Sequence, residues 1–348
     1  MPEQMPLKIL VVKLSSLGDV IHTLAAVSDA AAVLPGIQID WVVEEAFQEI
    51  PALHPAVSGV FPVAIRRWRR NWWQSRGEIR AARQAFRKTD YDLVIDAQGL
   101  IKSAIVSRLA KGRVVGLDRQ SSREPLASLT YARGYSVARQ QHAVTRLRQL
   151  FASALAYPLP DSPADFGLRV DRLAAAGQPK PNILFFHGTT WDTKHWPVAL
   201  WQQLAGLANT AGYGVLLPHG NAIELARAEA IKATSTDAQV LPRMSLTALA
   251  ACLAGVNGVV SVDTGPGHLA AALDVPMVSL YGPTNPLLTA PYGQHQSAIA
   301  ADDLACIPCM QRDCQYSDTD AAQIYPPCFR TTTPAKVWQR LLVQMAAA

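Results

Sequence analysis

Short apolar runs alternate with longer stretches of helical character along the chain, and this alternation begins twice. In the first half the runs are residues 8–14, 37–43 and 91–97, which are rich in Val, Ile and Leu. In the second half they resume at residues 182–188. Such alternation is typical of a parallel sheet with helices on both faces. The sequence therefore predicts an α/β protein with two doubly wound, Rossmann-like domains.

A segment rich in Pro, Ala and polar residues, 157–181, separates the two series and is the predicted linker. The 348 residues suit two domains, because a domain commonly contains about 100–200 residues. We predict one domain over residues 1–165, a second over 180–330, and a C-terminal helix over 334–348 that packs back on the first. Two facing sheets of this kind bind ligands in a central cleft, at the carboxyl ends of their strands.

Basic residues are concentrated in the first half of the chain. Residues 1–175 contain 23 Lys and Arg against 16 Asp and Glu, whereas residues 176–348 contain 9 against 11. The most basic segment, 64–88, has nine Lys and Arg, three Trp and one acid. Arg pairs with phosphates and carboxylates, and Trp prefers polar–apolar boundaries. The segment indicates an anionic partner, either nucleic acid or a membrane surface and its headgroups; the alternative is a solvated helix face.

No export signal is recognisable, since Lys13 interrupts the only apolar run near the N terminus. The longest uncharged stretch, residues 244–262, contains Ser, Thr and an Asn-Gly pair, so we interpret it as a helix, a turn and a buried strand rather than a membrane span. We therefore expect a cytoplasmic protein. Four of the five cysteines have a spacing that could hold a structural zinc, although we favour a compact reduced loop: Cys306, Cys309, Cys314 and Cys328.

Three loops of the second half carry candidate ligands for a phosphorylated nucleotide. Residues 187–197 follow a strand with hydroxyls and Lys194, which suit a diphosphate. Residues 261–274 run from a buried strand through Asp-Thr-Gly-Pro-Gly-His into a helix, whose first amides attract anions. Glu224 begins another helix, where an acid can bind ribose hydroxyls or simply favour the helix dipole. There is no Walker loop, and the absence of G-x-G-x-x-G after the first strand argues against a dinucleotide dehydrogenase.

Asp19 lies in a tight turn between the first strand and the first helix. It could only cap the helix, which is worth roughly 0.5–2 kcal/mol. A carboxylate at the carboxyl edge of a strand could instead accept a proton as a general base, and this is our hypothesis. His22, three residues later on the same helical face, could orient that carboxylate or the acceptor.

Several of these segments together resemble the lipopolysaccharide heptosyltransferases of glycosyltransferase family 9, which have two Rossmann-like domains in the GT-B arrangement. The matching segments include "KLSSLGDVIHTLAA", "DAQGLIKSA", "DTKHWP" and "SVDTGPGHLAAALDVPMVSLYGPT". Two others, "AIRRWRR" and "REPLAS", favour the first heptosyltransferase over the second. The resemblance spans residues 7 to about 300, and the cysteine-rich segment beyond it departs from the pattern.

The resemblance implies inverting transfer of L-glycero-D-manno-heptose from ADP-heptose to a Kdo sugar on lipid A, at the inner face of the inner membrane, without a cofactor or an active-site metal. It implies that Asp19 is the base. It implies that the donor is bound by Thr189, Thr190, Lys194, Glu224, Met244, Asp263, Thr264, Gly265 and His268. It implies that the acceptor is bound by Ser15, Ser16, Gly18, His22, Arg66, Arg67, Trp68, Arg69, Arg70 and Arg123, with Trp72 and Trp73 beside lipid or sugar.

Other classes of protein remain possible from the residues alone. A sugar-nucleotide transferase of another kind, or an epimerase of similar architecture, would use the second-half loops but would not need the basic first half. A nucleic-acid-binding protein would use residues 64–88 and leave those loops unexplained. The resemblance favours a lipid-linked acceptor and no nucleic acid.

Overall fold

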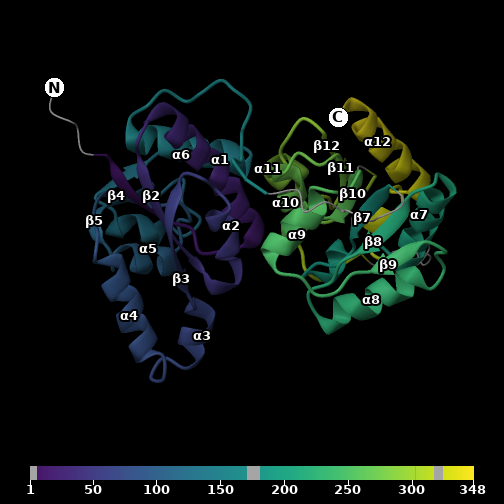
Figure 1. Cartoon of the computed structure of the whole chain (residues 1–348), viewed down its shortest axis with the longest axis horizontal. Helices are drawn as coiled ribbons and strands as arrows, with labels where there is room; N and C mark the ends of the chain where they lie inside the picture. The colour runs from purple at the N-terminus through teal and green to yellow at the C-terminus, as the bar shows by residue number, and fades with distance from the viewer. Residues whose placement is uncertain (1–5, 171–180, 302, 317–323) are drawn as a thin grey trace. The chain divides into compact units, whose positions relative to one another are not determined.

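Two six-stranded sheets, in which every strand pair is parallel, organise the chain (Figure 1). The computed structural model describes residues 6–170, 181–301, 303–316 and 324–348. The chain divides into two compact units, Met1–Arg169 and Val170–Ala348. The division falls within the predicted linker, of which residues 171–180 lie outside the described part. The predicted α/β class with two doubly wound sheets is confirmed.

The sheet of the first unit has the order β3-β2-β1-β4-β5-β6. Its strands are β1 Lys8–Val12, β2 Gln38–Glu44, β3 Val57–Val63, β4 Asp90–Asp96, β5 Lys111–Leu117 and β6 Arg133–Tyr135. Its helices are α1 Leu17–Val33, α2 Glu49–Ala52, α3 Ile65–Arg70, α4 Arg76–Phe86, α5 Ile101–Ser107 and α6 Ala143–Leu155, with 3₁₀ turns η1 Glu45–Phe47 and η2 Pro125–Thr130.

The second unit repeats this order, as β12-β11-β10-β7-β8-β9. Its strands are β7 Asn182–Phe186, β8 Gly214–Leu217, β9 Ala238–Val240, β10 Gly258–Val262, β11 Met277–Tyr281 and β12 Gln296–Ala300. Its helices are α7 Val198–Thr210, α8 Ala222–Lys232, α9 Leu246–Leu253, α10 Gly265–Ala272, α11 Pro286–Thr289 and α12 Pro334–Ala347, with 3₁₀ turns η3 Asp192–Lys194 and η5 Pro327–Phe329.

Central strands are apolar throughout because helices cover both faces of each sheet. Ile9, Leu10, Val11 and Val12 of β1 have no exposed surface. Residues 244–262 form α9 and β10, which confirms the interpretation as helix, turn and strand. Along the described residues, no helix has both the length and the apolar character needed to cross a bilayer.

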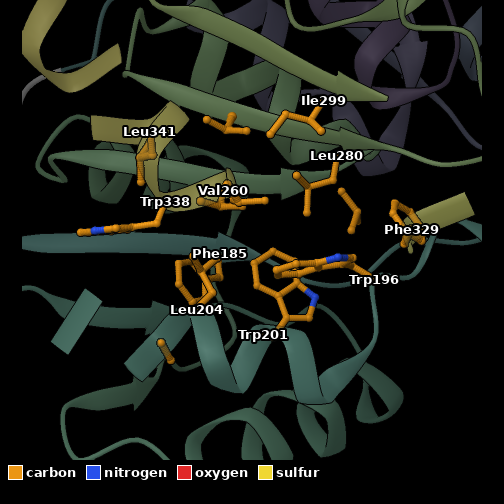
Figure 2. Packing of buried hydrophobic residues seen from close by; sticks show 14 of the residues in the cluster. Phe185, Trp196, Trp201, Leu204, Val260, Leu280, Ile299, Phe329, Trp338 and Leu341 are labelled. Carbon is orange, nitrogen blue, oxygen red and sulfur yellow. The ribbon is translucent and has the colours of Figure 1, made fainter. Parts of the chain in front are cut away.

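The C-terminal helix α12 packs within the second unit, beside α7 (Figure 1). Val337, Trp338 and Leu341 enter the core of that unit, where Trp196 and Trp201 meet edge to face with ring centres 5.0 Å apart (Figure 2). The prediction assigned the apolar face of this helix to the first domain. In the structure the second sheet and α7 occupy that face, because burial there removes three large side chains from water.

Each sheet has one point where the strand order reverses direction, and this point fixes where a ligand can bind. In the first sheet it lies between β1 and β4, and in the second between β7 and β10. The loops that leave neighbouring strands there diverge to opposite faces, so a crevice opens at the carboxyl ends. The first crevice is bordered by the Asp19 turn, and the second by the loop after β7 and the turn after β10.

Candidate active site

The Asp19 turn lies at the carboxyl end of β1 and forms a capping box. Asp19 Oδ2 accepts hydrogen bonds from Ser16 N at 2.9 Å and from Ser16 Oγ at 2.8 Å. Asp19 is the third residue of α1, and its side chain accepts from the N-cap residue Ser16, as in other capping boxes. The side chain of Asp19 is nevertheless 46% exposed, so the carboxylate both caps α1 and faces solvent.

Lys13 lies beneath this carboxylate. Its Nζ is 3.8 Å from Asp19 Oδ1 and donates to the carbonyl of Ala97 at 2.9 Å. Burial lowers the pKa of Lys13, while Asp19 and then Asp96 oppose this effect. Lys13 is therefore held within ion-pair distance of the Asp19 carboxylate.

The loop after β4 completes this crevice, and sequence reasoning did not assign its residues. Asp96 is fully buried and accepts bonds from the amides of Gln98 and Gly99 and the hydroxyls of Ser103 and Tyr131. Burial raises the pKa of Asp96, and these hydrogen bonds oppose the rise. Gly99 has φ +68°, which favours glycine. The turn is therefore rigid.

Two side chains of this loop reach the Asp19 turn. Gln98 Oε1 accepts from Leu14 N at 2.8 Å, and Lys102 Nζ donates to Ser15 Oγ at 3.0 Å. Lys102 is a half-buried cation whose pKa is lowered, first by burial. The signal that could have identified it was "DAQGLIKSA", an acid ending a strand with a lysine in the next helical turn. Lys102 lies 83 or more residues from the Asp19 turn in sequence, and the pairing of β1 with β4 brings the two together.

The four predicted arginines of residues 66–70 all lie on the short helix α3 and are exposed. Arg67 donates to Glu78 at 2.8 Å and to Glu45 at 3.2 Å, so its guanidinium is already paired. Those hydrogen bonds raise the pKa of Arg67. Arg67 is thus exposed but paired with two acids, and Arg66, Arg69 and Arg70 are exposed as well.

Trp68 differs from its prediction as a contact for lipid or sugar. It is only 9% exposed, packs in the core of the first unit, and its Nε1 donates to Glu78 at 2.8 Å. Trp68 is the buried residue of this six-residue helix and packs α3 against the core of the first unit. Trp72 and Trp73 are 52% and 62% exposed, and Arg76 stacks over Trp73 at 3.5 Å from the ring centre.

The remaining predicted acceptor residues lie in two groups. Ser15, Gly18 and His22 are buried around the Asp19 turn, and the His22 ring meets that of His142 with centres 5.7 Å apart. Ser16 and Arg123 are exposed. Arg123 contributes to the lowered pKa of Lys13, less than burial does, which places its charge in the same electrostatic environment.

In the second unit, the structure brings three predicted donor residues together at the β7–β10 crevice. Lys194 Nζ lies 2.6 Å from Asp263 Oδ2, and Thr284 Oγ1 donates to the same oxygen at 2.7 Å. Thr189 Oγ1 donates to the carbonyl of Asp263 at 3.1 Å. The ammonium also lies 4.4 Å from the centre of the Trp191 ring. A cation held between an acid and an aromatic ring is positioned to meet an entering anion.

The helix α10 follows this acid directly. Thr264 is its extended N-cap, Gly265 its first residue, and His268 is buried in its first turn. Pro266 has no N–H and Gly267 N donates to the carbonyl of Thr264 at 3.1 Å, so the amide of Gly265 and the positive end of the helix dipole are what this turn offers a phosphate oxygen.

Glu224 lies in the first turn of α8, the helix that follows β8, and Met244 lies on the loop that follows β9. Glu224 Oε2 accepts from Gly220 N at 2.7 Å, and its side chain rests against Gly188, where an added Cβ would come within 2.6 Å of Glu224 Cγ. Thr190 is exposed beside it, and Met244 is half-buried just before α9. His195 was not predicted; its Nε2 accepts from Thr189 N at 3.3 Å and so holds the hydroxyl loop.

The four cysteines of residues 306–328 are free thiols that line one cavity of about 150 Å³. Burial first, then the other three thiols, raises the pKa of Cys328 to about 12. In the parts of the chain that the structure describes, no three His, Cys, Asp or Glu side chains are arranged to hold a metal ion. The loop packs against the donor side, because Thr193 Oγ1 donates to the carbonyl of Gln311 at 2.9 Å.

Two doubly wound sheets, each with charged side chains at its crevice, are the architecture of glycosyltransferases of GT-B class. Comparison with known proteins agrees: the family "Glycosyltransferase family 9 (heptosyltransferase)" matches residues 79–319. The chain belongs to glycosyltransferase family 9, the heptosyltransferases, and the predicted family and enzyme class are confirmed.

Individual relatives cover nearly the whole chain. Lipopolysaccharide heptosyltransferase 1 of Pseudomonas aeruginosa is 53% identical over 98% of this chain and 99% of its own length. The structure of E. coli heptosyltransferase WaaC with ADP is 46% identical, with a TM-score of 0.80 over 84% of this chain and 92% of that one. WaaC with ADP-2-deoxy-2-fluoro heptose is also 46% identical, with a TM-score of 0.78 over 85% and 94%.

Proposed function

We propose that this protein transfers L-glycero-D-manno-heptose from ADP-heptose to the Kdo of Kdo-lipid A, with inversion, in the assembly of the lipopolysaccharide inner core. The proposal rests on the 53% identity of this chain to a heptosyltransferase 1, with Asp19 at the crevice of the first sheet and the Lys194–Asp263 loops at the crevice of the second. In this assignment the first unit binds the acceptor and the second the donor.

The donor's diphosphate is bound by the loops at the β7–β10 crevice. Lys194 supplies the positive charge, and the hydroxyl of Thr190 and the amide of Gly265 donate to the remaining oxygens, joined by the hydroxyl of Thr189 once it turns from the carbonyl of Asp263. Glu224 accepts from the ribose hydroxyls, Met244 lies against the adenine, and Asp263 and His268 line the sugar-diphosphate site. The relatives solved with ADP and with an ADP-heptose analogue support this choice of donor.

The acceptor is anionic, and the cations of the first unit match it. Arg66, Arg69, Arg70 and Arg123 are exposed, and Lys102 reaches the Asp19 turn through Ser15. Guanidinium groups bind carboxylates and phosphates in two-point contacts, which suits the Kdo carboxylate and the phosphates of lipid A. Lys102 joins the acceptor residues predicted from sequence.

The reaction follows from a base on one side and an anion site on the other. Asp19 accepts the proton of the acceptor hydroxyl while that oxygen attacks the anomeric carbon of the heptose. The new C–O bond forms as the bond to the β-phosphate breaks, and the electron pair leaves on ADP. Lys194 and the N-terminal end of α10 stabilise the charge that accumulates there. Attack opposite the leaving group inverts the anomeric centre.

We place the enzyme at the cytoplasmic face of the inner membrane as a peripheral protein, because its acceptor is anchored there. Trp72 and Trp73 are exposed beside the arginines of α3 and supply interfacial aromatic contacts. Anionic headgroups attract such a basic, aromatic surface.

Release of ADP tests the function. Purified protein incubated with ADP-heptose and Kdo-lipid A should release ADP only when both are present, and the product should gain one heptose by mass. Conversion of ADP-heptose without acceptor would indicate an epimerase, and tighter binding of single-stranded nucleic acid than of Kdo-lipid would contradict the proposed partner.

A further inference from the structure

Four exposed aliphatic side chains of the first unit form what we call the aliphatic patch: Ile101, Ile105, Leu126 and Leu129. Ile101 and Ile105 are 43% and 59% exposed and lie one turn apart on α5. Leu126 and Leu129 are 63% and 72% exposed and lie three residues apart on η2. Each pair therefore shares one face of its own helix.

The two helices adjoin, so the pairs belong to one region of surface. α5 packs against η2, Ile101 N donates to Glu124 Oε2 at 2.7 Å, and Glu124 N donates to the carbonyl of Gly99 at 3.1 Å. Isolated aliphatic residues are common on protein surfaces, whereas a group of four on two adjoining short helices indicates a site that contacts another apolar partner.

The charges around the patch are mostly positive. Lys102 stands between the two isoleucines in sequence, Arg123 precedes η2, and Arg108 ends α5 in exposed surface. The acid next to Arg123, Glu124, is engaged at the start of α5. After burial, Lys102 feels the charges of Glu44 and Glu124 as well as those of Arg66 and Arg69.

The patch borders the proposed acceptor site. Lys102 donates to Ser15, which precedes Ser16, the N-cap residue whose hydroxyl donates to Asp19. Ile101 and Ile105 on the same helix are exposed. One helix therefore presents apolar groups outward and a cation to the catalytic turn.

We propose that α5 and η2 dock on an anionic lipid bilayer, with the aliphatic patch inserted among the acyl chains and the surrounding cations at the headgroups. The surface is separate from Trp72 and Trp73. Apolar residues with neighbouring cations match a bilayer with anionic headgroups, because the apolar side chains contact the acyl chains and the cations contact the headgroups. This deepens the proposed function and rests on it, because a docked patch brings the Asp19 turn to the level of a lipid-anchored sugar.

Vesicle co-sedimentation tests the docking. The probe is a vesicle of phosphatidylethanolamine and phosphatidylglycerol, without any Kdo lipid. The double variant Ile105→Glu/Leu129→Glu should bind at least about tenfold more weakly than the wild type. The matched control is Leu287→Glu/Val343→Glu, which alters residues of the second unit that are 80% and 61% exposed, and it should bind within about twofold of the wild type. Unchanged binding of the patch variant, or an equal loss in the control, would overturn the proposal.

A second measurement tests the docking surface separately from the proposed function. With a deacylated, water-soluble Kdo acceptor the patch variant should keep the wild-type kcat/KM, and with acceptor embedded in vesicles it should lose activity. Equal loss on both acceptors would mean that the patch supports the fold or the site rather than docking. If the wild type used neither acceptor, the proposed function would fail, while sedimentation would still decide the docking surface.

Discussion

At the scale of single residues, Asp19 has two roles that the structure allows to be separated. Its Oδ2 serves the capping box, and an asparagine oxygen could accept the same two bonds from Ser16. Only the carboxylate can also accept a proton near neutral pH. Charge and cap can therefore be removed independently.

The first prediction concerns this separation. Asp19→Asn should lower kcat by about 10²–10⁴, the usual contribution of a positioned base, while the thermal midpoint and the affinity for ADP stay close to wild type. The control is Ser16→Ala, which removes the capping hydroxyl and should cost roughly 0.5–2 kcal/mol of stability with a much smaller change in kcat. If Asp19→Asn lost stability and kept its turnover, Asp19 would be a cap and nothing more.

The second prediction concerns Lys194. Its removal takes a cation from the diphosphate and also leaves the buried Asp263 carboxylate facing that diphosphate without its 2.6 Å partner. Lys194→Ala should therefore weaken use of ADP-heptose by roughly 2–4 kcal/mol in kcat/KM. Lys232→Ala, at an exposed position of α8 in the same unit, is the control and should change nothing measurable. A wild-type KM and kcat for Lys194→Ala would remove the residue from the donor site.

At the scale of elements, the short helix α3 shows how far sequence reasoning reaches. The segment was recognisable as cationic and aromatic, and the arginines are exposed. The sequence did not show that Arg67 would pair with acids of the same unit, because Glu45 and Glu78 come from other elements. The same holds for Trp68, whose burial depends on how α3 sits on β3 and α4.

The third prediction uses this pairing of Arg67. Arg69→Gln/Arg70→Gln should raise the KM for Kdo-lipid A and leave the KM for ADP-heptose unchanged, because both guanidinium groups are exposed in the unit assigned to the acceptor. Arg67→Gln is the comparison, and it should raise the acceptor KM less, since Arg67 already pairs with two acids. An equal effect of the two variants would mean that these acids do not withhold Arg67 from the acceptor.

Most of the fold was predictable from local pattern, and the site only in part. Strand and helix positions follow from apolar runs such as β1 and β7, and the Asp-Thr-Gly turn follows β10 as expected. Lys102 and Gln98 were missed because they meet the Asp19 turn through the pairing of β1 with β4, which no local pattern reveals. The C-terminal helix was assigned to the first domain because its apolar face alone does not say which sheet will cover it.

At the scale of the whole molecule, stability depends on buried groups that join distant segments. His54 is 3% exposed, its Nε2 pairs with Ser28 Oγ at 2.8 Å, and its Nδ1 accepts from Ala56 N at 3.1 Å. Burial lowers the pKa of His54 to about 4. Protonation would also remove the acceptor that Ala56 uses.

The fourth prediction is a loss of stability in mild acid. A histidine whose pKa is about 4 when folded and about 6.5 when unfolded contributes fully above pH 6.5, and its contribution is lost as the pH falls toward 4. The total for His54 is about 3 kcal/mol. Calorimetric melting temperatures of the wild type should therefore fall between pH 6.5 and 4 more steeply than those of His54→Gln. Parallel curves for the two proteins would show that this histidine is not responsible.

The identical strand order of the two sheets has an evolutionary consequence. Every hydrogen-bonded neighbour of each strand lies in its own half of the chain, so a genetic crossover near Arg169 would exchange complete sheets without cutting either. If each half recognises one substrate, the preference for a sugar nucleotide is encoded in one continuous segment of the gene, the half that binds the donor. A lineage could then acquire a new donor in one recombination event while retaining its acceptor.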